Sequence, residues 1–487
     1  MNLVLKNAHL VSPVDNLDMI GDILIENGLI KDIRSSIKHS KSIESIDLKG
    51  KTVVPGLYDM HVHFREPGQT HKENLISGAE AAANGGFTGV LCMPNTTPAI
   101  DNPVLLRDLI NRTRSNIVDI DFSVCATKSR KGEELSPILS LNEAGAVAIT
   151  DDGSPISDPE ILRRVFEYAS QSGLPVIQHC EDMRISNKGV MNEGLISTIT
   201  GMRGIPSASE TSVIARDIEI CSFVNGAHYH IQHISCGGSV RLLRSAKERG
   251  VSVTGEVCPH HFILTDKNCI DYDTNYKMNP PLRGIDDVEE ILSGLTDGTI
   301  DVICTDHAPH TEYEKSQGFY DSPFGIIGLE TAFGLAYTYL VRRDILSFNE
   351  LLFKMSVNPR RILGLDDVNI KMGVTANLSV FDLNSNLKFK PAFMTKAVSG
   401  APLSVDVTTN FLINNKLELG AGYRFDDSVS GLVNFYVLPN LRVGYSYDYT
   451  LSNLGRYNSG THEIFLLFDL DTSSLSSKGF EKSPRFF

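Results

Sequence analysis

The strongest constraint on the fold is a regular alternation of two kinds of segment between residues 52 and 305. Short apolar runs, which favour strands, alternate with longer amphipathic stretches, which favour helices. Eight such units are the signature of a (β/α)8 barrel, an α/β fold in which a parallel sheet closes on itself. The expected strands are 52–63, 86–93, 118–126, 146–151, 175–179, 227–233, 251–257 and 301–305, and the clearest helices are 73–83, 158–172, 209–224 and 238–249.

An open, doubly wound sheet is the alternative arrangement of the same segments. It is less favoured because no glycine-rich phosphate loop follows any of the expected strands. We therefore predict a catalytic barrel over 55–365, which ends in a helix over 347–365. Residues 1–54 read as short strands with turns, and with 366–386 they are expected to form a small β domain.

The pattern changes after residue 386. Apolar and polar side chains alternate with a period of two in 417–425, 441–449 and 464–470. This period is typical of antiparallel strands with one apolar face. We expect 387–487 to form an antiparallel β tail of roughly five or six strands.

Composition divides the chain at the same place. All 8 cysteines lie between Cys92 and Cys304, and 13 of the 14 histidines lie at or before His310. The tail carries ten Lys and Arg against nine Asp and Glu, so the net charge of −14 arises in the first 386 residues, which carry −15. An acidic front part argues against nucleic acid or an anionic membrane as its partner.

The compartment is predicted from cysteine usage and from the N-terminus. The cysteines form neither a CxxC motif nor a short secreted framework, which favours reduced thiols. Lys6, Asn7 and Asp15 interrupt the apolar core that a signal peptide needs, and no run of about 18 apolar residues could span a membrane. We expect a cytoplasmic protein.

Polar residues follow five of the expected strands. They are His61 with His63, Asp151 with Asp152, His179, His233 and Asp306. The carboxyl ends of barrel strands surround the active site, and side chains at i and i+2 of a strand point the same way. Four histidines with aspartates suit divalent metals, zinc first. Six ligands exceed one tetrahedral ion and would serve two ions that share a carboxylate and a hydroxide.

Each of these residues also has a structural interpretation. A single histidine on a strand is more often a core residue than a ligand, and Asp-Gly after a strand is usually a turn. Their joint placement on five strands favours the metal site. We interpret His228 and His230 as structural, and Cys180 and Cys304 as small apolar fillers.

Five motifs over residues 1–386 resemble the dihydroorotase family of the amidohydrolase superfamily. They are Asp59-Met-His-Val-His-Phe-Arg-Glu-Pro-Gly68, Met93-Pro-Asn-Thr96, Asp151-Asp-Gly153, Tyr276-Lys-Met-Asn-Pro-Pro-Leu-Arg283 and Thr305-Asp-His-Ala-Pro-His310. The resemblance implies a TIM barrel of the metal-dependent amidohydrolase type with a small β-sandwich domain. It also implies the reversible cyclisation of N-carbamoyl-L-aspartate to L-dihydroorotate, with loss of water, in pyrimidine biosynthesis.

The same resemblance implies a site with two zinc ions. His61 and His63 would hold one ion, and His179 and His233 the other. Asp152 would bridge them, although only the family distinguishes it from Asp151, and Asp306 would be both ligand and proton carrier. Related branches bridge with a carbamylated lysine, but strand 146–151 contains none.

The resemblance also implies a set of substrate-binding residues: His63, Phe64, Arg65, Asn95, Asn279, His310, Phe324 and Gly325. The planar guanidinium of Arg65 could hold a substrate carboxylate through two hydrogen bonds. A surface ion pair between Arg65 and Glu66 is the alternative. A homodimer, or association with aspartate transcarbamoylase, is a further implication.

The chemistry can be argued from the residues as well. Opening a ring amide needs a nucleophile and a polarised carbonyl, and zinc supplies both. Asp306 could accept the proton and pass it to the leaving ring nitrogen. Hydantoinase, dihydropyrimidinase and allantoinase are the competing enzymes, and they do not need a carboxylate clamp. An inactive scaffold homologue is the non-enzymatic alternative, which six filled ligand positions argue against.

The tail resembles the C-terminal end of PorP/SprF-type outer-membrane proteins of the type IX secretion system. The resembling segments are 389–406, 419–424, 457–463 and 483–487. A membrane barrel needs at least about 8 strands, so the tail alone could not close one. A joined or misassembled gene, a chimera and a natural fusion are the possible origins. We expect the tail sheet to pack loosely on the enzyme or to replace lost strands of the small domain, with exposed edges prone to aggregation.

Overall fold

The computed structural model describes residues 2–40, 43–383, 387–396, 404–413, 417–424, 428–438, 441–450 and 461–468. The chain forms two compact units, Met1–Phe381 and Asp382–Phe487. The first contains a barrel and a small β-sheet, and the second contains a separate antiparallel sheet. Among the described residues, no helix is long and apolar enough to cross a bilayer.

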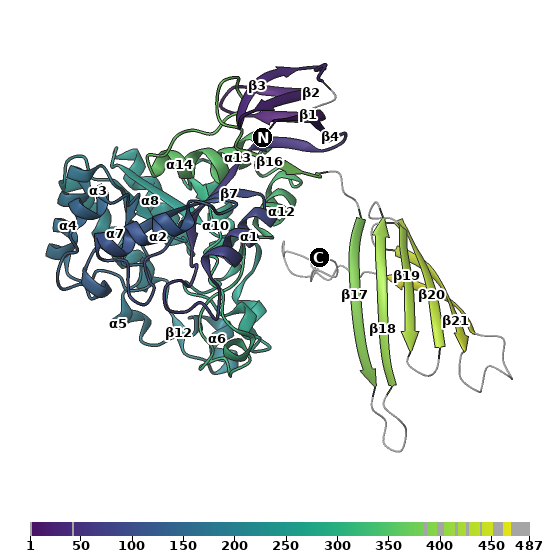
Figure 1. Ribbon diagram of the computed structural model, residues 1–487. Helices are drawn as coiled ribbons and strands as arrows, with labels where there is room; N and C mark the ends of the chain where they lie inside the picture. The colour runs from purple at the N-terminus through teal and green to yellow at the C-terminus, as the bar shows by residue number, and fades with distance from the viewer. Residues whose placement is uncertain are drawn as a thin grey trace. The chain divides into compact units, whose positions relative to one another are not determined.

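Eight parallel strands form the barrel of the first unit, in the order β15-β14-β13-β10-β9-β8-β7-β6 (Figure 1). The ring closes where Val62 pairs with His307 and the His63 N–H donates to the His307 carbonyl at 2.8 Å. The predicted (β/α)8 fold is therefore confirmed. The strands are β6 (Leu57–Val62), β7 (Phe87–Cys92), β8 (Asp119–Val124), β9 (Ala148–Ile149), β10 (Val176–Gln178), β13 (Tyr229–Ile231), β14 (Val253–Val257) and β15 (Val302–Ile303).

Helices surround these strands (Figure 1). The sequence sets their ends: α4 begins after Asp158, whose carboxylate accepts from the N–H groups of Glu160 and Ile161, and it ends at Gly173 with φ of 71°. The larger helices are α1 (Leu75–Asn84), α2 (Pro103–Thr113), α3 (Ile138–Glu143), α4 (Pro159–Ser172), α7 (Ala208–Phe223), α8 (Gly237–Glu248) and α10 (Ile285–Thr296). Shorter ones are α5 (Met183–Ser186), α6 (Leu195–Thr200), α9 (Pro259–Ile263), α11 (Glu312–Lys315) and α12 (Ala332–Ala336).

The helix expected over 347–365 consists of α13 (Phe348–Leu352), a π-helical segment (Phe353–Val357) and α14 (Asn358–Ile362). Pro359 lies just after the π-helical segment. Because proline has no N–H to donate to the carbonyl four residues earlier, the α-helical hydrogen-bond pattern is interrupted there.

The small sheet is built from both ends of the first unit. Its order is β16-β5-β1-β2-β3, and β4 also pairs with β1. Alternate apolar residues from these strands, such as Leu10, Ile23 and Val53, form one buried cluster. The strands are β1 (Asn2–Ser12), β2 (Leu17–Glu26), β3 (Leu29–Arg34), β4 (Glu44–Asp47), β5 (Thr52–Pro55) and β16 (Leu378–Phe381). Two further short strands, β11 (Met191–Asn192) and β12 (Gly204–Ile205), pair with each other in a separate two-stranded sheet.

The single strand predicted over 52–63 is wrong, because the segment is split at Gly56 between two sheets. Residues before Gly56 pair with β1 and β16, and residues after it pair with β7. A Cβ atom at Gly56 would lie 1.9 Å from Asn377 Oδ1 and 2.1 Å from Thr88 Oγ1. A larger residue at position 56, where the chain passes from the small sheet to the barrel, would require the side chains of Asn377 and Thr88 to move.

The second unit is a six-stranded antiparallel sheet in which each strand pairs with the next along the chain. Its described strands pair only with one another, so the expectation that they replace strands of the small sheet is wrong. One face carries exposed apolar side chains, among them Tyr423, Phe435 and Tyr445. The strands are β17 (Leu387–Lys396), β18 (Ser404–Ile413), β19 (Leu417–Arg424), β20 (Ser428–Leu438), β21 (Leu441–Thr450) and β22 (Thr461–Phe468). Of the predicted motifs, 397–403, 457–460 and 483–487 lie outside the described residues.

Candidate metal-dependent active site

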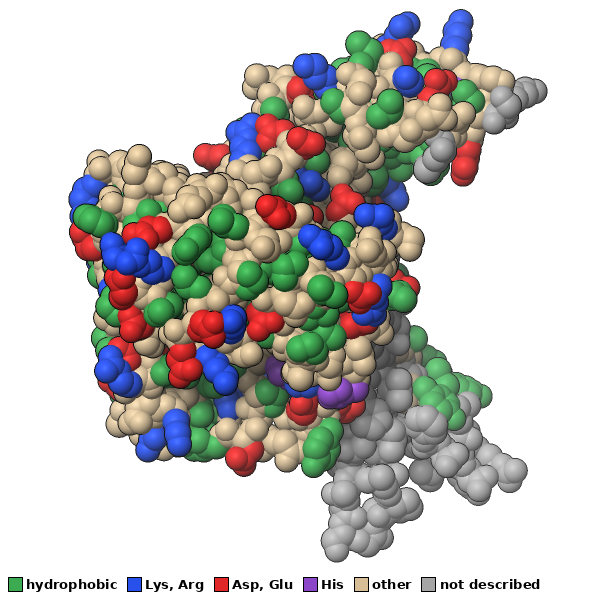
Figure 2. All heavy atoms as spheres, turned by 60° about the vertical axis from the view of Figure 1, so that its left-hand side comes forward, with side chains coloured by type: hydrophobic (Ala, Val, Ile, Leu, Met, Phe, Trp, Pro, Cys, Tyr) green, Lys and Arg blue, Asp and Glu red, His purple; other side chains and the backbone are tan. Residues whose placement is uncertain are grey.

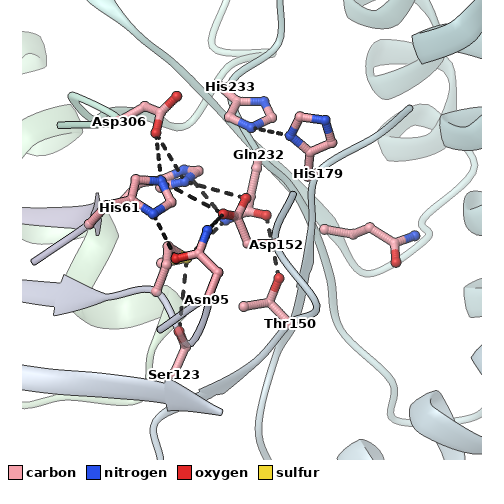
Figure 3. A network of polar contacts seen from close by, with 12 residues as sticks. His61, Asn95, Ser123, Thr150, Asp152, His179, Gln232, His233 and Asp306 are labelled. Carbon is pink, nitrogen blue, oxygen red and sulfur yellow. Dashed lines mark hydrogen bonds and ion pairs between the residues drawn. The ribbon is translucent and has the colours of Figure 1, made fainter. Parts of the chain in front are cut away.

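The structure brings the six predicted ligands together at the carboxyl ends of the barrel strands (Figure 3). His61 lies on β6, and each of the others follows its strand within a few residues. All except Asp306 are at most 6% exposed, and the Asp306 side chain is 13% exposed. The ligands are His61, His63, Asp152, His179, His233 and Asp306.

One group of donors forms around His61 on β6 and His63, which directly follows that strand. His61 Nε2 lies 3.6 Å from Asp152 Oδ1 and 3.5 Å from Asp306 Oδ1. His63 Nε2 lies 2.9 Å from Asp306 Oδ1 and 3.7 Å from Asp152 Oδ2. Both imidazoles therefore face the same two carboxylates.

The second group forms around the histidines that follow β10 and β13. His179 Nδ1 lies 2.9 Å from His233 Nε2, and Asp152 offers an oxygen within 4.8 Å of both rings. Asp152 thus belongs to both groups, where a bridging ligand would have to lie. Figure 3 shows its carboxylate between His61 and the pair formed by His179 and His233.

The donors fit a divalent ion. His61 Nε2 is buried and has no hydrogen-bond partner among the described residues. Its separation of 3.5–3.6 Å from the two carboxylates is too long for a hydrogen bond. Two donors that each lie about 2.0–2.2 Å from one ion at a tetrahedral angle are separated by about this distance. The imidazole and carboxylate set also matches the ligand preference of zinc.

Electrostatics in this pocket favour a cation. Burial opposes charge on His61, but Asp306 and Glu256 outweigh it and raise the pKa of His61 to about 10. Burial likewise opposes charge on Asp152, and His63, His61 and His179 lower its pKa below the usual value. The carboxylates around His61 thus make this pocket favourable for positive charge, whether a proton on His61 or a bound cation.

Two of the predicted ligands have unusual backbone conformations. His233 has φ of 30° and Asp306 has φ of 49°, in the left-handed region that residues other than glycine seldom adopt. Such strain concentrates at functional sites, where the surrounding structure holds it in place.

Asp151, the alternative bridging residue, points away from the histidines. Its carboxylate accepts hydrogen bonds from the Thr127 N–H at 3.1 Å and from the Thr127 hydroxyl. Burial raises the pKa of Asp151 to about 6. The structure therefore places Asp152, and not Asp151, among the histidines.

Arg65 lies at the edge of this site and does not pair with Glu66. Its Nε donates to the Pro309 carbonyl at 3.2 Å, and its Nη2 lies 3.4 Å from His310 Nε2. Glu66 instead pairs with Arg112 and accepts from the Leu75 N–H at 3.1 Å. Burial lowers the pKa of Arg65, and a carboxylate ligand would compensate the desolvated charge.

His310 connects Arg65 to the loop that carries Phe324 and Gly325. Its Nε2 lies 2.8 Å from the Phe324 carbonyl, and its Nδ1 lies 3.2 Å from Lys72 Nζ. Burial, Arg65 and Lys72 lower the pKa of His310 to about 4, so the ring is neutral at pH 7. Gly325 has φ of 144°, and a Cβ there would lie 2.6 Å from the Ala308 carbonyl oxygen.

The remaining predicted substrate residues lie close to the metal ligands. Asn95 Oδ1 lies 3.0 Å from His63 Nδ1, and its amide donates to Asp152 Oδ2 at 2.9 Å. Asn279 donates to Glu181 Oε2 at 2.8 Å. The Phe64 ring is buried edge-on against His307, so only its backbone could face a ligand.

Two glutamates that the sequence analysis left without a role contact these ligands. Glu256 Oε1 lies 2.6 Å from His61 Nδ1, and Glu181 Oε2 lies 3.0 Å from His179 Nε2. Glu256 could have been noticed in the sequence, because it is a glutamate within the apolar run 251–257. Glu181 was visible two residues after a predicted ligand, but its contact depends on the ring orientation.

Comparison with known proteins gives two family matches at different ends of the chain. Residues 50–239 match the family described as dihydro-orotase-like. Residues 329–468 match the family described as type IX secretion system membrane protein PorP/SprF. The second match includes β17–β22 and also the last helices of the first unit.

Curated relatives cover most of the chain. A dihydroorotase from Carboxydothermus hydrogenoformans is 49% identical over 389 residues, which are 80% of this chain and 90% of the relative. A dihydroorotase from Acetivibrio thermocellus is 44% identical over 411 residues, with coverage of 83% and 96%.

Solved structures agree on the fold. The L-hydantoinase (dihydropyrimidinase) of Arthrobacter aurescens has a TM-score of 0.69 at 23% identity and covers 77% of this chain and 86% of its own. The dihydropyrimidinase of Brevibacillus agri has a TM-score of 0.68 at 21% identity, with coverage of 81% and 88%. The barrel and its histidine–aspartate site define a cyclic amidohydrolase, a class that depends on metal ions. Within that class, the chain belongs to the dihydroorotase family.

Proposed function

We propose that this chain is a dihydroorotase with two zinc ions, which catalyses the reversible cyclisation of N-carbamoyl-L-aspartate to L-dihydroorotate with loss of water. Membership of the dihydroorotase family supports the reaction. The observation that carries the two-ion proposal is Asp152, which is shared by two groups of histidines. His61 and His63 would hold one ion, His179 and His233 the other, and Asp306 would complete the site.

The bound ions would supply a hydroxide nucleophile and a Lewis acid for the ring carbonyl. In the direction of hydrolysis, Asp306 accepts the proton of the nucleophile and gives it to the ring nitrogen as the amide bond breaks. Its carboxylate is suitably placed, because it lies at the edge of the cluster and is the most exposed of the ligands. In the direction of cyclisation, Asp306 takes the proton from the carbamoyl nitrogen.

Arg65 would bind the substrate carboxylate. Its guanidinium donates to the Pro309 carbonyl and lies beside the neutral His310. The negative charge of Asp306 also stabilises the charged form of Arg65. The planar fork can form two parallel hydrogen bonds with a carboxylate. Asn95, Asn279, His310, and the backbone of Phe64, Phe324 and Gly325 would complete the pocket.

The competing activities are less well supported. Hydantoinases and dihydropyrimidinases share the fold, but their reactions do not require a substrate carboxylate for Arg65 to bind. The segment 146–151 contains no lysine that could be carbamylated. An inactive scaffold would not need six filled ligand positions with outer hydrogen-bond partners.

The proposal extends to partners and compartment. All eight cysteines are free and buried, which supports a reducing cytoplasm. Acidic and basic side chains alternate over the face of the first unit in Figure 2, without the basic patch that nucleic acid needs. The partner is then a small molecule, and assembly as a homodimer or with aspartate transcarbamoylase would be compatible with it.

Zinc-loaded protein assayed with dihydroorotate, hydantoin and allantoin tests this proposal. We expect turnover of dihydroorotate to exceed that of the other two by at least about 100-fold. The variant Asp306→Asn should retain the fold and lose roughly 10²–10⁴-fold in kcat. Equal turnover of hydantoin, or an Asp306→Asn variant of normal activity, would refute the assignment.

A further inference from the structure

Two buried glutamates lie behind the metal groups, one behind each. Glu256 of β14 is fully buried, and its Oε1 lies 2.6 Å from His61 Nδ1. Glu181 is 6% exposed, and its Oε2 lies 3.0 Å from His179 Nε2. Both contacts are on the side of the imidazole that faces away from Asp152. Each glutamate thus touches a ligand of a different group.

These contacts determine which nitrogen of each ring carries hydrogen. An ionised carboxylate can only accept hydrogen bonds, so the ring nitrogen that faces it must be the donor. With an ion bound in place of the second proton, His61 would carry hydrogen on Nδ1 and offer the lone pair of Nε2, and His179 would carry hydrogen on Nε2 and offer the lone pair of Nδ1. The lone pairs lie on the two atoms that face the other ligands (Figure 3).

We propose that Glu256 and Glu181 are positioning residues, each of which fixes the tautomer and orientation of one histidine in one of the two metal groups. Glu256 would act on the ion held by His61, and Glu181 on the ion held by His179. The proposal rests on the two-ion function proposed above and assigns one outer carboxylate to each ion. Such partners raise the basicity of a histidine ligand and prevent ring rotation.

Glu256 also lies close to residues deeper in the barrel, and its contact with His230 is an ion-pair separation without hydrogen-bond geometry. Its Oε2 lies 3.3 Å from His230 Nε2, and His230 Nδ1 lies 2.8 Å from Thr254 Oγ1. The same hydroxyl lies 2.8 Å from His228 Nε2. A hydroxyl has one hydrogen and two acceptor lone pairs, so it can donate to at most one of the two imidazoles and can accept from the other.

Only one direction of this chain suits the carboxylate. If Thr254 donates to His230 Nδ1 and accepts from His228 Nε2, then His230 has its hydrogen on Nε2, facing Glu256. The opposite direction would turn a lone pair of His230 toward the carboxylate. His230 of β13 thus lies beside Glu256, and His228, which directly precedes β13, is connected to His230 through Thr254.

Glu181 is held from the substrate side. The Asn279 amide donates to its Oε2 at 2.8 Å, so one carboxylate oxygen receives both Asn279 and His179. The His179 ring is thereby connected to the segment 276–283, whereas His61 is connected only to the barrel interior. The two ions should thus respond to different substitutions.

Zinc affinity of the full chain tests the proposal, with Glu256→Gln and Glu181→Gln as nearly isosteric variants. Chelator competition would measure the dissociation constants of both ions, and thermal melting of the metal-free forms would measure stability. We expect each variant to weaken one ion by about 10–100-fold and to leave the other within about threefold. The double variant should weaken both ions.

Asp121→Asn is the matched control. Asp121 is a partly buried carboxylate of β8 that accepts a hydrogen bond from the Tyr58 hydroxyl at 2.7 Å. Its replacement by Asn should change the dissociation constant of neither zinc ion. Thr254→Val, which removes the hydroxyl but keeps the shape, should weaken the same ion as Glu256→Gln by a smaller factor.

Provided that wild-type protein binds two ions, three results would overturn the proposal. Both glutamine variants could bind zinc with wild-type affinity, both could weaken the same ion, or Asp121→Asn could have an equal effect. A wild-type chain that binds no zinc would overturn both this proposal and the two-ion function.

Discussion

The side-chain amide of Asn95 donates a hydrogen bond of 2.9 Å to Asp152 Oδ2. The carbonyl oxygen of the same side chain lies 3.0 Å from His63 Nδ1, so Asn95 joins the shared carboxylate to a ligand of the first group. Family resemblance alone would make Asn95 a substrate-binding residue. Its two contacts place it against two of the predicted metal ligands as well.

Asn95→Ala should therefore lower kcat by about 10–100-fold at saturating zinc, because Asp152 and His63 both lose a fixed partner. Thr96→Ala, which removes the neighbouring hydroxyl that donates to the Pro98 carbonyl, should leave kcat within about twofold. Steady-state kinetics with dihydroorotate measures both. A rise in KM with unchanged kcat would show that Asn95 binds only substrate.

Arg65→Lys should raise KM for dihydroorotate by about 10-fold or more, because a lysine keeps the charge but loses the planar fork. Dihydrouracil has the same ring without the carboxylate, so its affinity as a competitive ligand should not change in Arg65→Lys. Arg163→Lys, in an exposed ion pair of α4, is the control. Equal losses with both ligands would indicate that Arg65 supports the pocket and does not bind the carboxylate.

Stability should depend on pH through His310. Its pKa of about 4 in the folded state lies below the ordinary value of 6.5, so between these values the unfolded chain binds more protons. His310 therefore lowers the free energy of unfolding as the pH falls from about 6.5 to about 4, by on the order of 2–3 kcal/mol.

Replacement by Gln should remove this contribution. Thermal midpoints of metal-free wild type and His310→Gln, measured from pH 7.5 to pH 4.5, should fall more steeply for the wild type toward the acidic end, whatever the offset between the two proteins at pH 7.5. Parallel curves would show that His310 titrates alike in both states.

Removal of 387–487 should leave kcat/KM within about twofold, because β16 completes the small sheet from residues before the cut. The first unit, Met1–Phe381, contains the whole candidate site. The shortened chain should also aggregate less, since it lacks the exposed apolar face of β19–β22. Loss of activity together with loss of the metal-free thermal transition would mean that the tail stabilises the enzyme.

Much of this fold follows from periodicity, because buried parallel strands read as continuous apolar runs and antiparallel ones as alternation. The strand 52–63 shows the limit of that reasoning. Nothing in the local pattern distinguishes one long strand from two, and the break at Gly56 depends on contacts with Asn377 and Thr88, far away in the sequence.

The candidate site could likewise be predicted from the sequence only in part. His61, His63, His179 and His233 could be predicted because strand ends in a barrel converge. The choice between Asp151 and Asp152 could not, because it depends on Thr127, which binds the first of them from another strand end. Glu256 was also missed, since its role depends on the direction in which the His61 ring is turned.

The most direct test of the central claim is dihydroorotate hydrolysis by full-length protein that has been stripped of metal and titrated with zinc. The account predicts negligible activity without metal and full recovery at two zinc ions per chain, with hydantoin turned over at least about 100-fold more slowly. Full activity in the stripped protein, or recovery for hydantoin and not for dihydroorotate, would contradict it.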